Sequence, residues 1–154
     1  MYILFFFRKL LYIDKRYEPS TLTVYSQDFY LRKYPEYSEI FAFNKKALFH
    51  HFNTTGISEG ECASPAFDIR YYLEKNKNLR RTFGYNYTAA FEYFLKKGKN
   101  ETDEFSPIFN VQYYIDNNPD LRIAFGDNNY EYYMHYMING RIEGRMATFE
   151  QFEI

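Results

Sequence analysis

The sequence has little of what stabilises small domains without a large core. It contains one cysteine, which excludes an internal disulfide and a cysteine-rich zinc site. Its 7 glycines and 5 prolines are too few for a collagen-like or linker-like chain. At 154 residues the chain has the length of one domain, and folding at that size buries about 70% of the unfolded surface. Stability is therefore expected to come from a hydrophobic core.

Neither sign of charge is in excess, and long hydrophobic runs are missing. Lys and Arg number 19 and Asp and Glu number 20, which gives a formal net charge of −1. This balance argues against a general binder of nucleic acids or anionic membranes. The apolar run at the N-terminus is only 7 residues long before Arg8 and Lys9, too short to span a bilayer. We therefore expect no nucleic-acid partner and no transmembrane span.

Aromatic residues, by contrast, are abundant and recur at a fixed period. The 18 Tyr and 17 Phe make up 23% of the chain, which excludes intrinsic disorder. Residues 25–66, 67–108 and 109–150 align without gaps as three segments of 42 residues, and all 7 glycines fall on three columns of this alignment. Five columns hold one residue type throughout: Tyr30/Tyr72/Tyr114, Phe41/Phe83/Phe125, Asn44/Asn86/Asn128, Gly56/Gly98/Gly140 and Glu59/Glu101/Glu143.

Each segment is expected to contain three helices. The first follows an N-cap residue. The aromatic residue just before this cap and the tyrosine five positions after that aromatic residue have the spacing of a hydrophobic staple. The N-caps are Ser26, Asp68 and Asn110. The second helix is short, packs Phe41, Phe83 or Phe125 into the core, and ends at a left-handed glycine, Gly84 or Gly126, in two segments.

The third helix is expected to start at an asparagine cap and to end at a glycine in the C′ position. These residues are Asn44, Asn86 and Asn128, and Gly56, Gly98 and Gly140. Its inward face should carry Leu48 and Phe52, Ala90 and Phe94, or Tyr132 and Tyr136. The aromatic columns headed by Tyr25, Phe29, Tyr30, Phe41 and Phe52 are expected to form the core.

The prediction for the fold is an all-α chain of three tandem 42-residue helical repeats, stacked as a short solenoid with an N-terminal capping helix. Its parts are residues 1–24 (capping helix and linker), 25–66, 67–108 and 109–154, the last including a C-terminal tail. A compact bundle without solenoid stacking is the alternative. For residues 1–13, a truncated signal peptide or a membrane-surface helix competes with the capping helix.

Few residues indicate chemistry. His51 and His135 share a column, but Tyr93 replaces them in the middle segment, so a required metal ligand or general base is not expected there. Cys62 lies in a predicted loop with no partner suggesting a nucleophile. No cofactor or metal is predicted, and we expect a protein that is not an enzyme.

Two sets of residues are candidates for binding. Glu59, Glu101 and Glu143 form the one ionisable column, and could contact a ligand or, as we favour, accept from free amides or pair with a local Lys99 or Arg141. Tyr87, Tyr130 and Tyr133 lie near the starts of third helices, where they could form an exposed recognition face or simply replace leucine.

The repeat pattern resembles tandem helical repeats of bacterial secreted and surface proteins. The residues that carry this resemblance are Ser64-Pro65-Ala66-Phe67-Asp68, Tyr71-Tyr72-Leu73, Asn118-Pro119-Asp120-Leu121, Ala124-Phe125-Gly126, His135-Tyr136, Gly140 and Glu143-Gly144-Arg145. It covers about residues 25–150, and the first segment departs from it at Tyr37 and Glu61, where leucine and arginine are typical. Such repeats often accompany domains that act on cell walls or carbohydrates, and they supply no agreed catalytic residues.

The resemblance implies a secreted or cell-surface location. Together with the repeats, it suggests a non-catalytic binding or spacer module whose partner is a protein or a glycan. The alternative is an accessory subunit or fragment of an enzyme of glycan synthesis or cell-wall remodelling, which a deep pocket gathering His135 with carboxylates would favour. The oligomeric state is left open.

Overall fold

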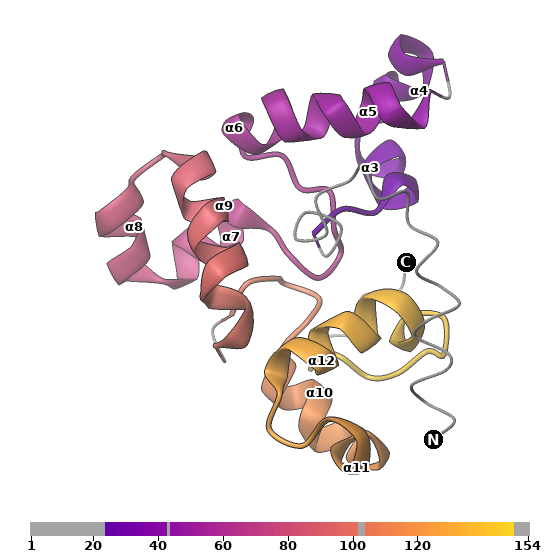
Figure 1. The fold of residues 1–154 in the computed structure, drawn as a ribbon, viewed down its shortest axis with the longest axis vertical. Helices are drawn as coiled ribbons and strands as arrows, with labels where there is room; N and C mark the ends of the chain where they lie inside the picture. Colours follow the sequence, from indigo (N-terminus) through magenta and orange to yellow (C-terminus); the bar gives the residue numbers. More distant parts are fainter. Residues whose placement is uncertain (1–23, 43, 102–103, 150–154) are drawn as a thin grey trace.

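The computed structural model describes residues 24–42, 44–101 and 104–149 (Figure 1). Over these residues the regular structure is helical, with two isolated β-bridges and no strand, so the all-α prediction is confirmed. None of the helices in this part of the chain is long and apolar enough to cross a membrane. The predicted capping helix lies outside the described residues.

The helices form three groups that follow one another along an arc (Figure 1). The first group contains α3 (Gln27–Lys33), α4 (Glu36–Phe41) and a continuous helix made of α5 (Lys45–His51), a π-helical turn η1 (Phe52–Gly56) and α6 (Ile57–Glu59). The second contains α7 (Ile69–Lys75), α8 (Lys77–Phe83), α9 (Tyr87–Lys96) and η2 (Gly98–Asn100). The third contains α10 (Val111–Asn117), η3 (Pro119–Leu121), α11 (Arg122–Phe125), α12 (Asn129–His135) and the π-helical η4 (Tyr136–Gly140).

The first helix of every group begins where its cap predicts. Side-chain oxygens of the N-cap residues accept hydrogen bonds from amides that a helix start otherwise leaves free. The bonds run from Phe29 N to Ser26 Oγ (3.4 Å), Arg70 N to Asp68 Oδ1 (2.9 Å) and Tyr113 N to Asn110 Oδ1 (2.8 Å).

The asparagine caps of the third helices are confirmed in two groups of three. Asn44 and Asn86 accept from Ala47 N and Ala89 N, each at 3.1 Å. Asn128 makes no such bond, although α12 begins at the next residue.

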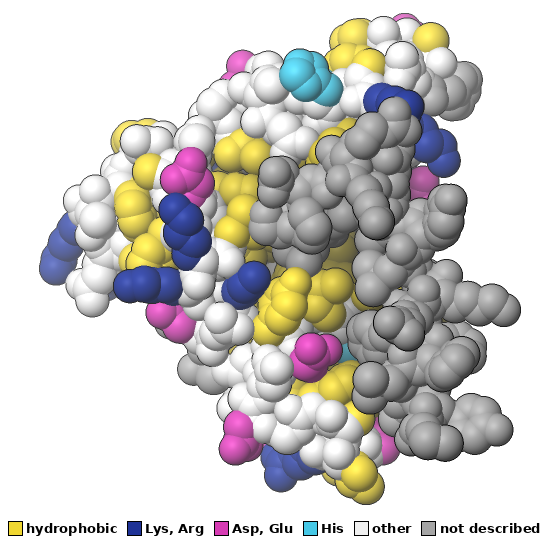
Figure 2. All heavy atoms as spheres, in the orientation of Figure 1, with side chains coloured by type: hydrophobic (Ala, Val, Ile, Leu, Met, Phe, Trp, Pro, Cys, Tyr) yellow, Lys and Arg dark blue, Asp and Glu magenta, His cyan; other side chains and the backbone are white. Residues whose placement is uncertain are grey.

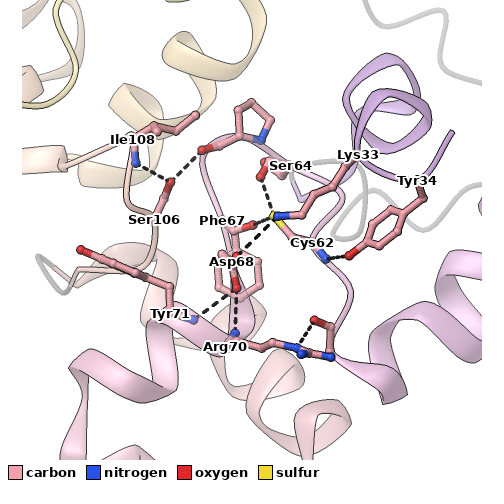
Figure 3. A network of polar contacts seen from close by, with 12 residues as sticks. Lys33, Tyr34, Cys62, Ser64, Phe67, Asp68, Arg70, Tyr71, Ser106 and Ile108 are labelled. Carbon is pink, nitrogen blue, oxygen red and sulfur yellow. Dashed lines mark hydrogen bonds and ion pairs between the residues drawn. The ribbon is translucent and has the colours of Figure 1, made fainter. Parts of the chain in front are cut away.

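A backbone hydrogen bond closes each group by joining its N-cap residue to the segment that leaves the group. The donors are Ser26 N, Asp68 N and Asn110 N, and the acceptors are Ala63 O (2.7 Å), Phe105 O (2.9 Å) and Ala147 O (2.8 Å). The two connecting segments also meet each other, because the Ser106 hydroxyl donates to the Pro65 carbonyl at 2.7 Å (Figure 3).

Aromatic side chains form one continuous core. The tyrosines that recur in every segment, Tyr30, Tyr72 and Tyr114, are all 0% exposed. Rings also bridge neighbouring groups: the centroids of Phe52 and Phe91 are 6.1 Å apart, and those of Phe94 and Tyr133 are 6.3 Å apart. The predicted inward faces of the third helices are confirmed, since all their members are buried: Leu48, Phe52, Ala90, Phe94, Tyr132 and Tyr136.

Two of the expected core columns are only half-buried. Phe41, Phe83 and Phe125 pack against the core from outside, because α4, α8 and α11 lie at the periphery of their groups (Figure 1). The column headed by Phe29 is likewise half-buried.

The role predicted for Gly56, Gly98 and Gly140 is wrong. None of them has positive φ, and Gly56 is helical at −56°, so they are not left-handed C′ residues. Instead, the hydroxyl of the recurring tyrosine occupies the space of their missing side chains. A Cβ on Gly56 would lie 2.6 Å from Glu61 Oε2 and 2.8 Å from Tyr30 Oη, and on Gly98 or Gly140 it would come closer still to Tyr72 or Tyr114. Positive φ does occur at the predicted stops Gly84 (58°) and Gly126 (53°).

Candidate functional site

A polar hollow of about 330 Å³ opens where the first group meets the second (Figure 3). Its walls come from the end of α3, the segment that follows α6, and the start of α7. The lining residues are Lys33, Tyr34, Glu59, Gly60, Glu61, Cys62, Asp68 and Arg70. The hollow thus presents cationic, anionic and phenolic groups together.

Arg70 is held at the rim by backbone carbonyls. Its Nε donates to Gly60 O at 2.9 Å and its Nη2 donates to Glu59 O at 2.7 Å. These bonds satisfy carbonyls at the end of α6, where the helix leaves acceptors free. Its guanidinium also lies 5.6 Å from the centroid of the Tyr87 ring. The side chain therefore keeps one position while its outer edge stays in solvent.

Lys33 and Asp68 face each other across the hollow (Figure 3). Lys33 Nζ is 3.9 Å from Asp68 Oδ2, and the two side chains are 42% and 20% exposed. At that separation and exposure the pair contributes little to stability. The other carboxylate oxygen, Oδ1, caps α7 and fixes Asp68 in place, while Lys33 Nζ also lies 5.9 Å from the centroid of the Phe29 ring.

Cys62 is a buried thiol at the floor of the hollow. Its Sγ contacts the carbonyl oxygens of Ser64 (3.2 Å) and Phe67 (3.4 Å), while its amide donates to Tyr34 Oη at 3.2 Å. Burial raises the pKa of the thiol to about 11, so the group is protonated at neutral pH. Because the thiolate is the nucleophilic form, this environment fits a structural cysteine.

Glu61 is the centre of a buried polar cluster beside the hollow. Tyr37 Oη donates to Glu61 Oε1 at 2.6 Å, and Tyr30 Oη donates to Oε2. His51 Nε2 lies 3.7 Å from the same Oε2, and the Glu61 side chain is only 10% exposed. Burial first, and the neighbouring carboxylate next, raise the pKa of both tyrosines above the ordinary value. The carboxylate is therefore fully engaged in holding α3, α4 and α5 together.

The third group has a different cluster at the matching place. Tyr114 Oη lies 2.8 Å from Nδ1 of the buried His135. Arg145 Nη1 donates to Asn118 Oδ1 at 3.1 Å and to Asp120 Oδ1 at 2.9 Å. Burial lowers the pKa of His135, and the hydrogen bond from Arg145 lowers that of Asp120. These contacts hold the segment that follows η4 against the end of α10 and against η3.

The recurring glutamates do not act alike. Glu143 pairs with Arg145 at 2.5 Å rather than with the suggested Arg141. Glu101 accepts from Tyr93 Oη at 3.4 Å. The Glu59 side chain is exposed, and its carbonyl is the acceptor for Arg70. Glu143 therefore has a structural role in the third group, because it is paired with Arg145. A role of Glu59, Glu101 and Glu143 in binding stays a prediction.

The predicted tyrosine face does not exist as a set of three. Tyr133 is 0% exposed, because its ring packs against Phe105 (5.7 Å between centroids) and Phe109 (5.9 Å). Tyr87 and Tyr130 are half-buried, and each lies under a cation, Arg70 and Lys99 respectively. Of the six candidate binding residues, the structure brings Glu59 and Tyr87 together, because Arg70 donates to the Glu59 carbonyl and its guanidinium lies over the Tyr87 ring.

Sequence reasoning missed Glu61 and Arg70. The signal for Glu61 was that it departs from the repeat pattern in the same segment as Tyr37, its hydrogen-bond partner. Arg70 gave no signal, because its contacts depend on how the end of one group meets the start of the next.

No cluster of three or more His, Cys, Asp or Glu placed to hold a metal ion occurs in the described ranges. No family model matches the chain, and neither the curated proteins nor the solved structures include a match.

Proposed function

We propose that the chain is a non-catalytic helical-repeat module that holds a protein or glycan partner at a cell surface. In this proposal residues 25–66, 67–108 and 109–150 are repeats stacked as a short solenoid. The first helices of the groups begin at residues 27, 69 and 111, and this equal spacing supports the repeat. The packing of α6 on α9 and of η2 on α12 supports stacking between neighbours.

The observation that carries the proposal is the preorganised polar hollow. Arg70, Asp68 and Tyr34 face it, and each is held by backbone groups. Groups that are already fixed lose little conformational freedom when a ligand binds. A hollow with both donors and acceptors suits a partner rich in hydroxyl or amide groups, which glycans and proteins both offer.

The alternative, an accessory subunit or fragment of a glycan-synthesis enzyme, would be favoured by a pocket joining His135 to carboxylates. His135 is instead buried against Tyr114, and the hollow is lined by other residues. The one thiol of the hollow is protonated at neutral pH.

The test is a glycan array with neutral and acidic sugars, run beside a pull-down from a cell-surface extract, with identified ligands measured by titration calorimetry. We expect saturable binding and recovery of the ligand with unchanged mass. Lys33→Gln combined with Asp68→Asn removes one charge of each sign from the hollow while asparagine still caps α7. This variant should bind at least tenfold more weakly.

The matched control is Lys96→Gln with Glu92→Gln, an exposed ion pair on α9 away from the hollow, which should bind like the parent. The proposal is wrong if no ligand binds saturably, if the ligand is chemically changed, or if both double variants lose affinity equally.

A further inference from the structure

An aromatic and basic surface covers the projecting second group. It consists of Arg70, Lys77, Arg80, Arg81, Tyr85 and Tyr87. In Figure 2, Lys and Arg side chains lie with hydrophobic ones over the end of the molecule that holds α8 and α9, and Asp and Glu side chains lie among them. This surface adjoins the hollow through Arg70, which belongs to both.

The surface is positive although the whole chain is nearly neutral. Residues 75–91 include four cations and no carboxylate, whereas the matching residues 117–133 of the third segment include three carboxylates and one cation. Across the described part of the chain, no carboxylate lies within 4.0 Å of the charged nitrogens of Arg70, Lys77, Arg80 or Arg81. Their charge is therefore available to an external anion.

Arginine and tyrosine alternate along this surface. The guanidinium of Arg70 lies 5.6 Å from the Tyr87 ring, the rings of Tyr87 and Tyr85 meet edge to face at 6.4 Å, and the guanidinium of Arg80 lies 3.8 Å from the Tyr85 ring. Stacking of this kind orients a guanidinium without using its hydrogen-bond donors, and of the two arginines only Arg70 also donates from Nε and Nη2 to backbone carbonyls.

Both arginines are also anchored to the backbone. Arg80 Nη1 donates to Gly84 O at 3.0 Å, while its Nε and Nη2 have no acceptor among the described residues. The free Nε and Nη2 edge of Arg80 therefore matches a carboxylate with two parallel hydrogen bonds. Tyr85 is 74% exposed, so the ring beside Arg80 is available to a ligand.

We propose that this surface binds a linear acidic polysaccharide whose sugar rings bear carboxylates, a uronate chain. The inference rests on the proposed binding function and names its ligand class. Arg80 would take a carboxylate through Nε and Nη2, Arg70 would pair with a second one through its remaining Nη1, and the exposed Tyr85 ring would pack on the C–H face of the sugar between them. An acidic protein segment is the competing ligand, because arginine and tyrosine are also frequent at protein interfaces, and a comparison with polyglutamate tests it directly.

The experiment titrates the full chain with an oligogalacturonate of defined length, its methyl-esterified form and a polyglutamate of similar length. The methyl ester keeps the sugar and removes the charge, whereas polyglutamate keeps the charge and removes the sugar. We expect saturable binding of the oligogalacturonate, and affinity at least tenfold lower for each of the other two. Binding should weaken with salt, because it depends on ion pairs.

Two variants and one control locate the site. Arg80→Gln with Arg81→Gln should weaken binding of the oligogalacturonate at least tenfold, and Tyr85→Ser should weaken it severalfold. The control Lys45→Gln with Lys46→Gln removes the same charge from exposed positions of α5 and should bind like the parent. Circular dichroism of each variant checks that the helices are intact.

The outcomes separate this inference from the broader proposal. Equal affinity for polyglutamate, equal loss in the control, or no binding of the oligogalacturonate overturns the inference. Binding of a neutral glycan or an identified protein at the hollow, with no uronate binding, overturns the inference and leaves the proposed function standing. Failure of every ligand overturns both.

Discussion

The hydroxyl of Tyr37 donates to Glu61 Oε1 at 2.6 Å across 24 residues of sequence. Tyr37 stands in the column of Leu79 and Leu121, and Glu61 stands in the column of Asp103 and Arg145. Both residues differ from those typical of the repeats that the chain resembles, and they contact each other. Because a buried carboxylate needs hydrogen-bond donors, Glu61 depends on the hydroxyl that Tyr37 brings.

Removing this donor should destabilise the protein. A hydrogen bond to a charged group contributes about 1.5–3 kcal/mol, so Tyr37→Phe should lower the free energy of unfolding by about that much. Urea denaturation at pH 7 measures the change. Tyr85→Phe, at a ring that is 74% exposed, is the matched control and should change stability by less than about 0.5 kcal/mol. Equal effects of the two substitutions would contradict the assigned role of Tyr37.

The contact between Tyr72 and Gly98 predicts a conditional effect. Gly98→Ala places a methyl group against Tyr72 Oη and should destabilise by about 1–3 kcal/mol. In a Tyr72→Phe background the nearest obstructing atom is gone while the Phe94 ring carbon 3.0 Å away remains, so the same substitution should cost distinctly less. A double-mutant cycle measured by thermal or urea unfolding gives the coupling. A cost of Gly98→Ala that is the same in both backgrounds would show that the hydroxyl is not the reason for glycine.

Depth of burial predicts unequal costs for two phenylalanines. Phe94 is 0% exposed and its ring centroid lies 3.9 Å from that of Phe67. Phe94→Ala should therefore cost about 3–5 kcal/mol. Phe83 is half-buried at the periphery, and Phe83→Ala should cost about 1–3 kcal/mol, less than Phe94→Ala. Chemical denaturation ranks the two, and a larger loss at Phe83 would refute this assignment of the core.

Burial of His135 predicts a stability that falls in mild acid. Its folded-state pKa is lowered by burial, whereas in the unfolded chain it is about 6.5. The unfolded chain thus takes up the proton first, so this stabilisation is complete above about pH 6.5 and is lost as the pH falls below it. The free energy of unfolding should drop between pH 7.5 and 5.5 by more in the parent than in His135→Gln. Identical drops would show that His135 does not contribute.

The sequence by itself determined the features that depend on neighbours in the chain. Ser26, Asp68 and Asn110 cap their helices through bonds to amides two or three residues away, so a short window contains the whole interaction. The inward faces of the third helices follow from helical periodicity in the same way. The aromatic composition likewise indicated a real core.

Only the tertiary structure decided the features that join distant segments. Gly56 is predicted from the sequence to end a helix, but its lack of a side chain leaves room for Glu61 and for Tyr30, which lies 26 positions earlier. Tyr133 resembles a surface tyrosine until Phe105 and Phe109 cover it. Arg70 acquires its place only when the end of α6 meets the start of α7. Local signals depend on spacing along the chain, whereas these contacts depend on which surfaces meet in space, and for that reason the candidate site could not be read from the sequence.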